Sequence, residues 1–417
     1  MSGRRPEPSP TPGPPRRRPG APDASPRRRI ARRVVTPLAE FLRTEAAGGI
    51  VLLGATAVAL AWANADPGGY ADFWHTELRL GIEEDLQHWV NDGLMAVFFF
   101  VVGLEIKREL VTGELRDPRA AALPAIAAAG GMVVPALVYT AWNLGSGDTG
   151  GWGIPMATDI AFAIGVMSLL GARVPAALKL FLLTLAIVDD IGAIAVIAVF
   201  YTDTLRTTWL LGAVAAAAAV LVLRRMRVSR VIAYAPPAVA LWFCVLESGV
   251  HATIAGVVLG LLTPAVWPHG PSPIERLEHV LHPVSSFVVV PLFALANAGV
   301  RIDGDAVSGA LGSPVAWGIF TGLVAGKFVG VTAAAELARR SGAGQVPPGV
   351  SRRHLGGAAA LAGIGFTVAL FIAELSFGDD RALLNEAKIA VLAASAVAGL
   401  SGVAILASGR GRGAVEP

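Results

Sequence analysis

The sequence has few cysteines and few charged residues, and both shortages exclude whole classes of protein. Its single cysteine, Cys244, cannot form an intramolecular disulfide or supply a metal site built from several thiolates. Only 16% of the 417 residues are charged and 54% are hydrophobic. A soluble domain has about 25% charged residues, because its surface must be hydrated. The composition therefore excludes a soluble enzyme and indicates a protein that crosses a membrane several times.

Apolar stretches follow one another along almost the whole chain after residue 37. A helix needs about 20 apolar residues to cross a bilayer. Twelve stretches approach or reach this length, near 46–64, 90–110, 120–142, 151–171, 176–200, 208–224, 230–246, 250–267, 283–300, 313–336, 355–377 and 387–407. We predict an all-α, polytopic inner-membrane protein with about twelve transmembrane helices over residues 38–408. A disordered Pro- and Arg-rich tail over 1–37 and a short tail over 409–417 would flank it.

Positive charge predicts how the chain is oriented. An even number of spans leaves both termini on one side, and most of the 34 Lys and Arg residues fall on that side. Cytoplasmic loops are enriched in Lys and Arg, so we expect cytoplasmic N- and C-termini. The basic tail then follows the same rule, and we expect no nucleic-acid partner. The acidic and aromatic outer loop over 65–89 is a candidate contact for a homodimer.

Four ionisable residues interrupt the predicted spans near mid-depth: Asp159, Asp189, Asp190 and Lys327. A charge at the centre of a bilayer costs about 2.5–3.5 kcal/mol, so its retention requires a reason. Ion pairs that fasten helices together could explain Asp159 and Lys327. They explain two adjacent aspartates less well, because like charges on consecutive residues repel each other.

The chemistry of adjacent carboxylates suggests ion exchange. Consecutive helical residues point about 100° apart, so one carboxylate can face a cavity while the other faces a neighbouring helix. Loss of hydration and mutual repulsion both favour protonation. Oxygen ligands also suit small hard cations, and a carboxylate binds either a proton or a cation. We predict cation/proton exchange at Asp189 and Asp190, with no catalytic residues and no cofactor.

Two spans contain helix-breaking residues at a similar depth. Pro155 lies in the fourth span, and Gly363 and Gly365 lie in the eleventh. Broken membrane helices expose half-helix ends whose dipoles attract opposite charge. We expect Asp159 to neutralise two N-terminal ends and Lys327 two C-terminal ends. Spans three to five and ten to twelve would then be related as an inverted repeat with two crossed discontinuous helices.

At these residues the sequence resembles the NhaA family of bacterial sodium/proton antiporters. The resemblance runs from about Thr44 to Leu406. It is carried by NDGLMAVFF (91–99), VGLEIKRE (102–109), ATDIAFA (157–163), AIVDDIGAI (186–194), SGVHAT (248–253), LEHVLHP (277–283), GK (326–327) and GIGFT (363–367). This family is itself a known case of inverted repeats with broken helices at the bilayer midplane.

The resemblance implies electrogenic, pH-regulated exchange of Na⁺ or Li⁺ for H⁺, about two protons inward per cation outward. It implies that Asp190 is the main cation and proton ligand and that Asp189 is its partner, paired with Lys327. The remaining implied positions are, at the helix crossing, Thr158, Asp159, Gly363 and Gly365; towards the external side, Asp92; and in the pH response, Glu105, Glu109, His251, Glu278, His279 and His282.

Some features depart from the family, and other interpretations stay open. The long basic tail has no counterpart, and Glu247 and Glu275 replace expected lysines, which puts the pH set-point in doubt. A sodium-coupled symporter on the same fold is the main alternative, although the aspartate pair with Lys327 argues against it. A retinal protein would use Lys327 as its Schiff-base amine. An intramembrane aspartyl protease would need a Gly-x-Gly-Asp motif, which does not occur.

Overall fold

The computed structural model describes residues 26–79, 83–202, 205–228, 230–265 and 272–408. The chain divides into two compact units, residues 1–41 and 42–417, and the fold below is that of the second. Of the two expected tails, residues 1–25 and 409–417 lie outside the described residues. Helix α1 begins at Pro26, a residue well suited to a first helical position, and the expected disorder of residues 1–37 stays a prediction.

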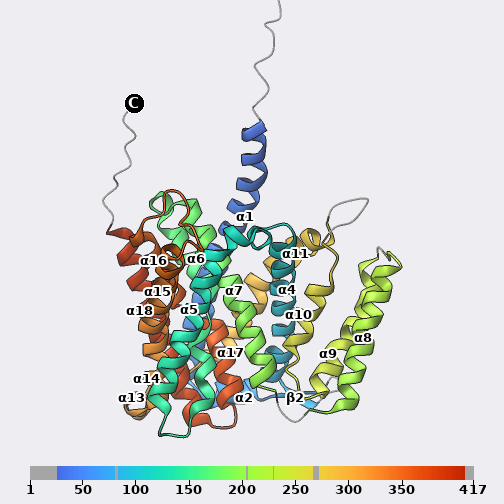
Figure 1. Cartoon of the computed structure of the whole chain (residues 1–417). Helices are drawn as coiled ribbons and strands as arrows, with labels where there is room; N and C mark the ends of the chain where they lie inside the picture. Colours follow the sequence, from blue (N-terminus) through green and yellow to red (C-terminus); the bar gives the residue numbers. More distant parts are fainter. Residues whose placement is uncertain (1–25, 80–82, 203–204, 229, 266–271, 409–417) are drawn as a thin grey trace, which may run out of the picture. The chain divides into compact units, whose positions relative to one another are not determined.

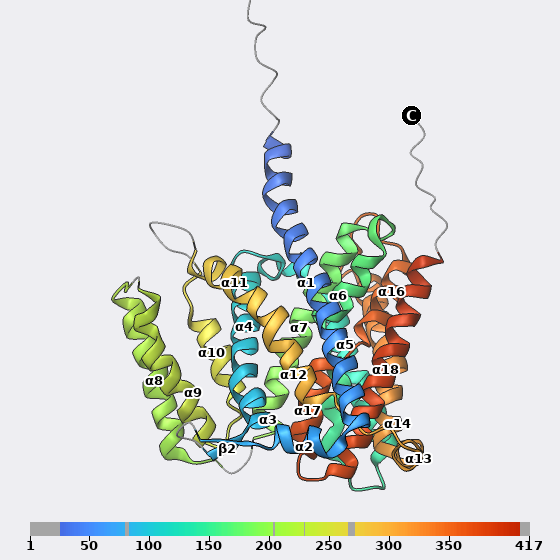
Figure 2. The same ribbon diagram turned by 180° about the vertical axis from the view of Figure 1, so that it is seen from behind.

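Helices form nearly all of the described chain, and the all-α prediction is confirmed (Figures 1 and 2). In chain order, the elements at the twelve expected spans are α1 (Pro26–Ala65), η1 (Trp89–Leu94) with α4 (Met95–Val111), α5 (Pro118–Asn143), η3 (Thr149–Met156) with α6 (Ile160–Leu169), α7 (Ala176–Phe200), α8 (Thr207–Arg225), α9 (Ala235–Glu247), α10 (Thr253–Leu262), α11 (Pro273–Val284) with η6 (Ser285–Val289) and α12 (Val290–Asn297), α14 (Pro314–Thr321) with η7 (Gly322–Gly326) and α15 (Lys327–Arg340), α16 (Arg352–Ala362) with α17 (Phe366–Phe377), and α18 (Arg381–Ala407). The connecting elements are α2 (Pro67–Trp74), β1 (Glu77–Arg79), β2 (Glu83–Asp85), α3 (Leu86–His88), η2 (Glu114–Arg116), η4 (Gly171–Arg173), η5 (Val231–Tyr234) and α13 (Gly304–Gly312).

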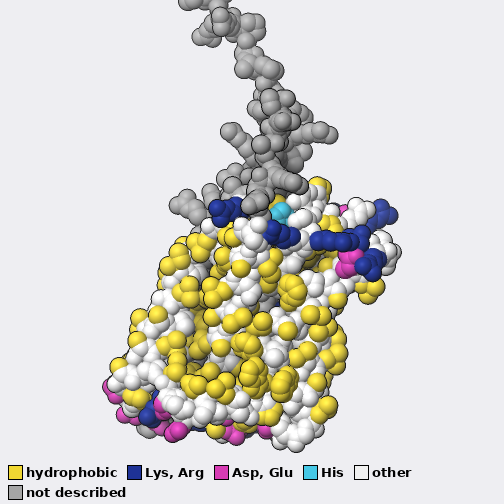
Figure 3. Space-filling view, turned by 90° about the vertical axis from the view of Figure 1, so that its left-hand side faces the viewer, with side chains coloured by type: hydrophobic (Ala, Val, Ile, Leu, Met, Phe, Trp, Pro, Cys, Tyr) yellow, Lys and Arg dark blue, Asp and Glu magenta, His cyan; other side chains and the backbone are white. Residues whose placement is uncertain are grey.

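The helices have the length and composition that a bilayer requires. Within the described ranges, nine helices are long and apolar enough to span a membrane, and the stretches 231–247 and 253–262 are shorter apolar helices. The remaining expected span is α4, which has 17 residues and carries four charged residues near one end. The face in Figure 3 is covered by hydrophobic side chains, and charged side chains gather at its two ends. The protein is therefore a multi-pass membrane protein.

Small residues allow two pairs of helices to approach closely, as is usual inside membranes. Helix α4 packs on α10 at Gly103, Gly256 and Gly260, and α5 packs on α15 at Gly130 and Gly330. A Cβ atom at Gly260 would lie 2.6 Å from the carbonyl carbon of Gly103, which is too close for any side chain. The backbones of each pair are in contact, so these pairs are the closely packed part of the fold.

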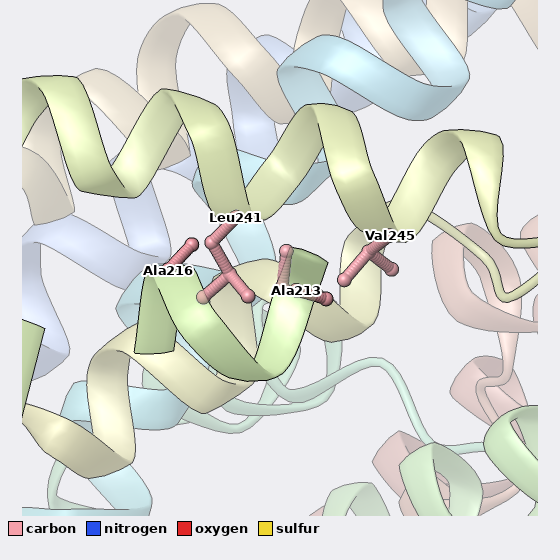
Figure 4. Packing of buried hydrophobic residues seen from close by; sticks show 5 residues of the cluster. Ala213, Ala216, Leu241 and Val245 are labelled. Atoms are coloured by element: carbon pink, nitrogen blue, oxygen red, sulfur yellow. The ribbon is translucent and has the colours of Figure 1, made fainter. Parts of the chain in front are cut away.

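Helices α8 and α9 pack mainly on each other and lie side by side at one flank of the unit. Ala213 and Ala216 of α8 meet Leu241 and Val245 of α9 in a small buried cluster (Figure 4). An apolar cavity of about 820 Å³ is lined by residues of α4, α9, α10 and α11. At one end of this cavity the indole N–H of Trp242 donates to the carbonyl oxygen of Asp92 at 2.9 Å.

The loop over residues 65–89, which we expect on the outer side, contains the paired strands β1 and β2 and a cluster of ionisable side chains. Asp85 Oδ2 lies 2.7 Å from His75 Nδ1, and Asp85 Oδ1 lies 2.7 Å from His88 Nδ1. Partial burial by itself would raise the pKa of Asp85, but these hydrogen bonds hold it below its ordinary value. Burial would lower the pKa of His88, but its bond to Asp85 raises it.

Substituting Gly256 by Val should destabilise the fold, because the new side chain would overlap the backbone of Ala96 and Phe100 on α4. Overpacking of this kind costs about 1–3 kcal/mol. Thermal melting of the detergent-purified protein measures the effect. Gly54→Ala is the matched control, since a Cβ atom there meets nothing within 4 Å. Equal melting temperatures for the two variants would contradict the close packing of α4 on α10.

The outer cluster should stabilise its loop over a limited pH window. Asp85 has a lowered pKa, so its contribution to the stability of the loop is complete above the ordinary pKa of about 4. That contribution is lost as the pH falls through the lowered pKa. The contribution of His88, whose pKa is raised, is complete below its ordinary value of about 6.5 and is lost as pH rises through the raised value. Hydrogen exchange in residues 75–88 should therefore accelerate above this window in the wild type. His88→Gln should remove that pH dependence, and an unchanged dependence would contradict the assignment.

Candidate functional site

Two helices are broken at the centre of the second unit, and their breaks touch each other. An extended segment, residues 157–159, separates η3 from α6, and residues 363–365 separate α16 from α17. The backbone N–H of Asp159 donates to the carbonyl oxygen of Ile364 at 2.6 Å. The hydroxyl of Thr158 lies 2.9 Å from the carbonyl oxygen of Ala362. The two crossed discontinuous helices expected from the sequence are therefore present.

The two glycines of the second break are needed because the backbone comes close to its neighbours. Both adopt negative φ, so strain is not the reason. A Cβ atom at Gly363 would overlap the carbonyl oxygen of Leu323. A Cβ atom at Gly365 would lie 3.2 Å from the carbonyl oxygen of Ala157. Small residues at these two positions allow the two breaks to come together.

Asp159 joins the N-terminal ends of α6 and α17, the two half-helices that begin at the breaks. Its side chain is buried, and Oδ1 accepts the N–H of Phe162 in the first turn of α6 at 2.9 Å. Oδ2 accepts both the N–H and the hydroxyl of Thr367 in the first turn of α17, at 3.0 and 2.6 Å. One carboxylate thus satisfies unpaired donors of two helices and places negative charge at both positive dipole ends.

Lys327 faces one C-terminal end, and the sequence led us to expect two. It follows the π-helical turn η7 and is completely buried. Its ammonium donates to the carbonyl oxygen of Met156, where η3 ends, and to Asp189 Oδ2 at 2.5 Å. The end of α16 is served by the Thr158 hydroxyl instead. The difference arises because the ammonium is engaged by Asp189.

The adjacent aspartates differ in their partners. Asp189 is 1% exposed, and its Oδ2 receives Lys327 and the Thr158 hydroxyl, which lies 2.5 Å away. Its other oxygen, Oδ1, is buried and has no hydrogen-bond partner within the described residues. Asp190 is 5% exposed and has no hydrogen bond or ion pair to any residue that the structure describes. Buried carboxylate oxygens are therefore left available beside the helix crossing.

A second group of buried ionisable residues joins α4 to α11. Arg108 pairs with Glu278 and lies 3.4 Å from Glu109, while His282 Nε2 lies 3.8 Å from Glu105 Oε1. All four acidic and histidine side chains in this group are buried. The sequence placed them in one group, but it did not single out Arg108. The position of Arg108 between Glu105 and Glu109 in one apolar span was the signal that could have found it.

The other expected residues lie apart from this group. His279 is exposed on α11, and His251 is half-buried in the turn between α9 and α10. Trp242, near the same end of α9, contacts Asp92 at the start of the second span. Glu105 and Glu109 lie near the other end of that span, so His251 is remote from them. Asp92 lies in η1, the end of that span that adjoins the outer loop.

Thr367 is a site residue that sequence reasoning quoted within a motif without assigning it a part. Its position, two residues after Gly365, makes it one of the first residues of the second half-helix. A Thr there can present both a backbone donor and a hydroxyl donor to the opposite chain. That position was the available signal, although the acceptor on Asp159 required the structure.

The sequence model of the family described as Na⁺/H⁺ antiporter 1 matches residues 39–406. The chain belongs to the NhaA family of Na⁺/H⁺ antiporters. It is 49% identical to "Na(+)/H(+) antiporter NhaA 3" of Frankia alni, with 89% of each chain covered. It is 48% identical to "Na(+)/H(+) antiporter NhaA" of Mesorhizobium japonicum, covering 93% of this chain and 98% of the relative. The protein of the same name from Cronobacter sakazakii is also 48% identical, with 90% and 98% covered. The family match over residues 39–406 includes both broken helices and the aspartate pair.

Removing one partner of the Asp189–Lys327 pair should destabilise the protein more than removing both charges. Lys327→Met leaves Asp189 buried without its ammonium, and loss of one partner of a buried pair costs about 3–5 kcal/mol. Asp189→Asn combined with Lys327→Met keeps an acceptor for Thr158 and buries no charge. The double variant should therefore melt at a higher temperature than Lys327→Met in detergent. A further loss of stability in the double variant would contradict a simple buried ion pair.

Proposed function

We propose that this chain is an electrogenic, pH-regulated antiporter that extrudes Na⁺ or Li⁺ in exchange for protons, with two protons per cation. The observation that carries the proposal is the pair Asp189 and Asp190, buried beside two broken helices with carboxylate oxygens that no described residue engages. Oxygen ligands of this kind suit a small hard cation and also bind protons. The names of the relatives, which state Na⁺/H⁺ antiport, support the same assignment.

The proposed cycle uses competition at one site. When the site is open to the cytoplasm, Asp190 and Asp189 release protons and bind sodium through their oxygens. Thr158 and Lys327 hold Asp189 Oδ2, so the cation meets Oδ1 and the Asp190 carboxylate. Reorientation presents the site outward, where protons displace the cation. Two protons for one sodium carry one net charge per cycle, worth about 2.3 kcal/mol per 100 mV, so the membrane potential helps to extrude sodium.

The distribution of charge supports an orientation in which both termini lie on the cytoplasmic side of a bacterial inner membrane. The last turns of α8 and α15 contain the pairs Arg224–Arg225 and Arg339–Arg340. Figure 3 shows Lys and Arg side chains at one end of the unit and Asp and Glu side chains at the other. Positive charge is retained on the cytoplasmic side. The transporter domain is residues 38–408. In this orientation the loop over 65–89 faces outward, where a second copy of the chain could contact it to form a homodimer.

The buried group between α4 and α11 is the proposed pH-response site. Its residues come from two helices, with Glu278 paired to Arg108 and His282 lying 3.8 Å from Glu105. Glu105 also acts electrostatically on Asp190, so the charge state of this group is felt at the cation site. We extend the proposal to Glu109, which also contacts Arg108, and to His251 and His279, which lie outside the group.

Asp190→Asn should abolish exchange, because an amide neither releases a proton nor offers an anionic ligand. Sodium-dependent collapse of ΔpH in everted vesicles measures this, and the loss should exceed tenfold. Asp379→Asn, at an exposed aspartate, is the control and should keep the wild-type rate. Exchange near the wild-type rate in Asp190→Asn would contradict the assignment. Sodium flux without proton movement in the wild type would favour the symporter instead.

A further inference from the structure

The inner half of the second broken helix begins with a capping box in which a histidine takes the usual place of Glu or Gln. Ser351 is the N-cap of α16, and its hydroxyl oxygen accepts the backbone N–H of His354 at 3.2 Å. In return, His354 Nδ1 accepts the backbone N–H of Ser351 at 3.2 Å. Capping boxes normally use a Glu or Gln side chain as this second acceptor.

This hydrogen bond defines the charge state of His354. A backbone N–H can only donate, so Nδ1 must carry a lone pair and the ring proton must be on Nε2. The imidazole is therefore neutral in this arrangement. Protonation would place a hydrogen on Nδ1, remove the acceptor and leave the Ser351 N–H without its partner. A Glu or Gln side chain has no such limitation in the range where histidine titrates.

The charged residues around the first turn of α16 are mostly basic. The first turn contains Arg352 and Arg353 and no acidic residue. The elements packed on α16 are α6, α7, α15 and α18, whose charged residues towards this end are Arg173 after α6, Lys179, Glu336, Arg339 and Arg340. Glu336 is the one acidic residue among them, and three arginines (339, 340 and 352) already pair with it. Protonation of His354 would add a third positive charge to a first turn that already contains Arg352 and Arg353, at the positive end of the helix dipole.

Helix α16 connects this cap to the cation site. It has 11 residues, and its last residues, Gly357–Ala362, are all buried. The carbonyl oxygen of Ala362 lies 2.9 Å from the Thr158 hydroxyl, which also contacts Asp189. Helices of about this length are marginal unless their ends and faces are stabilised. Loosening of the first turn of α16 would therefore be transmitted along this short helix to Ala362, whose carbonyl oxygen holds Thr158 in place.

We propose that His354 is a pH-sensitive cap, which holds α16 only while its imidazole is neutral and lowers antiport when its side of the membrane is acidified. The inference rests on the proposed function and orientation, which place this cap in the cytoplasm. An exchanger that brings protons in is then slowed when the cytoplasm is already acidic. The device is separate from the Arg108 group, because it lies on α16 and shares no residue with α4 or α11.

The decisive variant is His354→Gln, since Gln keeps both capping-box bonds and cannot be protonated. Its antiport rate in proteoliposomes should equal the wild-type rate at pH 8.5. At pH 6 its rate should exceed the wild-type rate about threefold, because Gln keeps the hydrogen bond to the Ser351 N–H that protonation of His354 removes in the wild type. His354→Lys, which is always charged and has no acceptor, should reduce the rate at pH 8.5 towards that of the wild type at pH 6. His88→Gln, at a histidine of the outer loop, is the control and should leave the acid limb unchanged.

Superimposable pH profiles of wild type and His354→Gln would overturn the proposal, as would full activity of His354→Lys at pH 8.5. Amide hydrogen exchange of residues 351–357, corrected for intrinsic rates, gives a readout that does not need transport. Exchange there should be faster at pH 6 than at pH 8 in the wild type and equal at both pH values in His354→Gln. If no variant exchanges sodium or lithium at any pH, the proposed function fails, and the hydrogen-exchange difference alone decides whether the cap exists.

Discussion

The structure depends on one constraint: polar groups of the backbone inside a membrane must have partners, and broken helices leave several without one. Asp159 resolves most of this at the crossing, because its two oxygens receive three donors from α6 and α17. Lys327 and Thr158 meet the carbonyl ends of η3 and α16. The breaks are stable because these side chains replace the missing turns. The glycines at 363 and 365 allow the backbones close enough for these bonds to form.

The cation site follows from how the crossing is satisfied. Lys327 serves a carbonyl end, so its ammonium is fixed in place, and its second partner is Asp189. The pairing neutralises Asp189 and leaves Asp190 as the excess negative charge at this depth. The Thr158 hydroxyl holds the same Asp189 oxygen from the other side. The residues that repair the broken helices are therefore also the residues that determine which carboxylate oxygens stay available.

Much of this arrangement could be predicted from the sequence. Apolar runs located the spans, and the depth of Asp159, Asp189, Asp190 and Lys327 indicated the residues that lie buried at the helix crossing, because buried charge is costly enough to be informative. Contacts made by backbone atoms could not be predicted. The carbonyl end of α16, which we assigned to Lys327, is met by the Thr158 hydroxyl, and only the three-dimensional structure shows this. His354 was overlooked because a capping box is recognised in sequence by Glu or Gln.

The excess charge at Asp190 also explains why the proposed exchange is coupled instead of being a leak. With Asp189 paired to Lys327, an empty deprotonated site has one uncompensated negative charge in a medium of low dielectric constant, where an unpaired charge is strongly disfavoured. A sodium ion removes that charge. In the proposed cycle two protons, one on each carboxylate, remove it and leave the positive charge of Lys327 uncompensated, and protons and sodium cannot bind together. Reorientation is then easiest for a site loaded with one or the other. A return without either ion would have to carry the bare carboxylate through the least hydrated part of the protein, so each cation that leaves must be replaced by protons before the cycle can close.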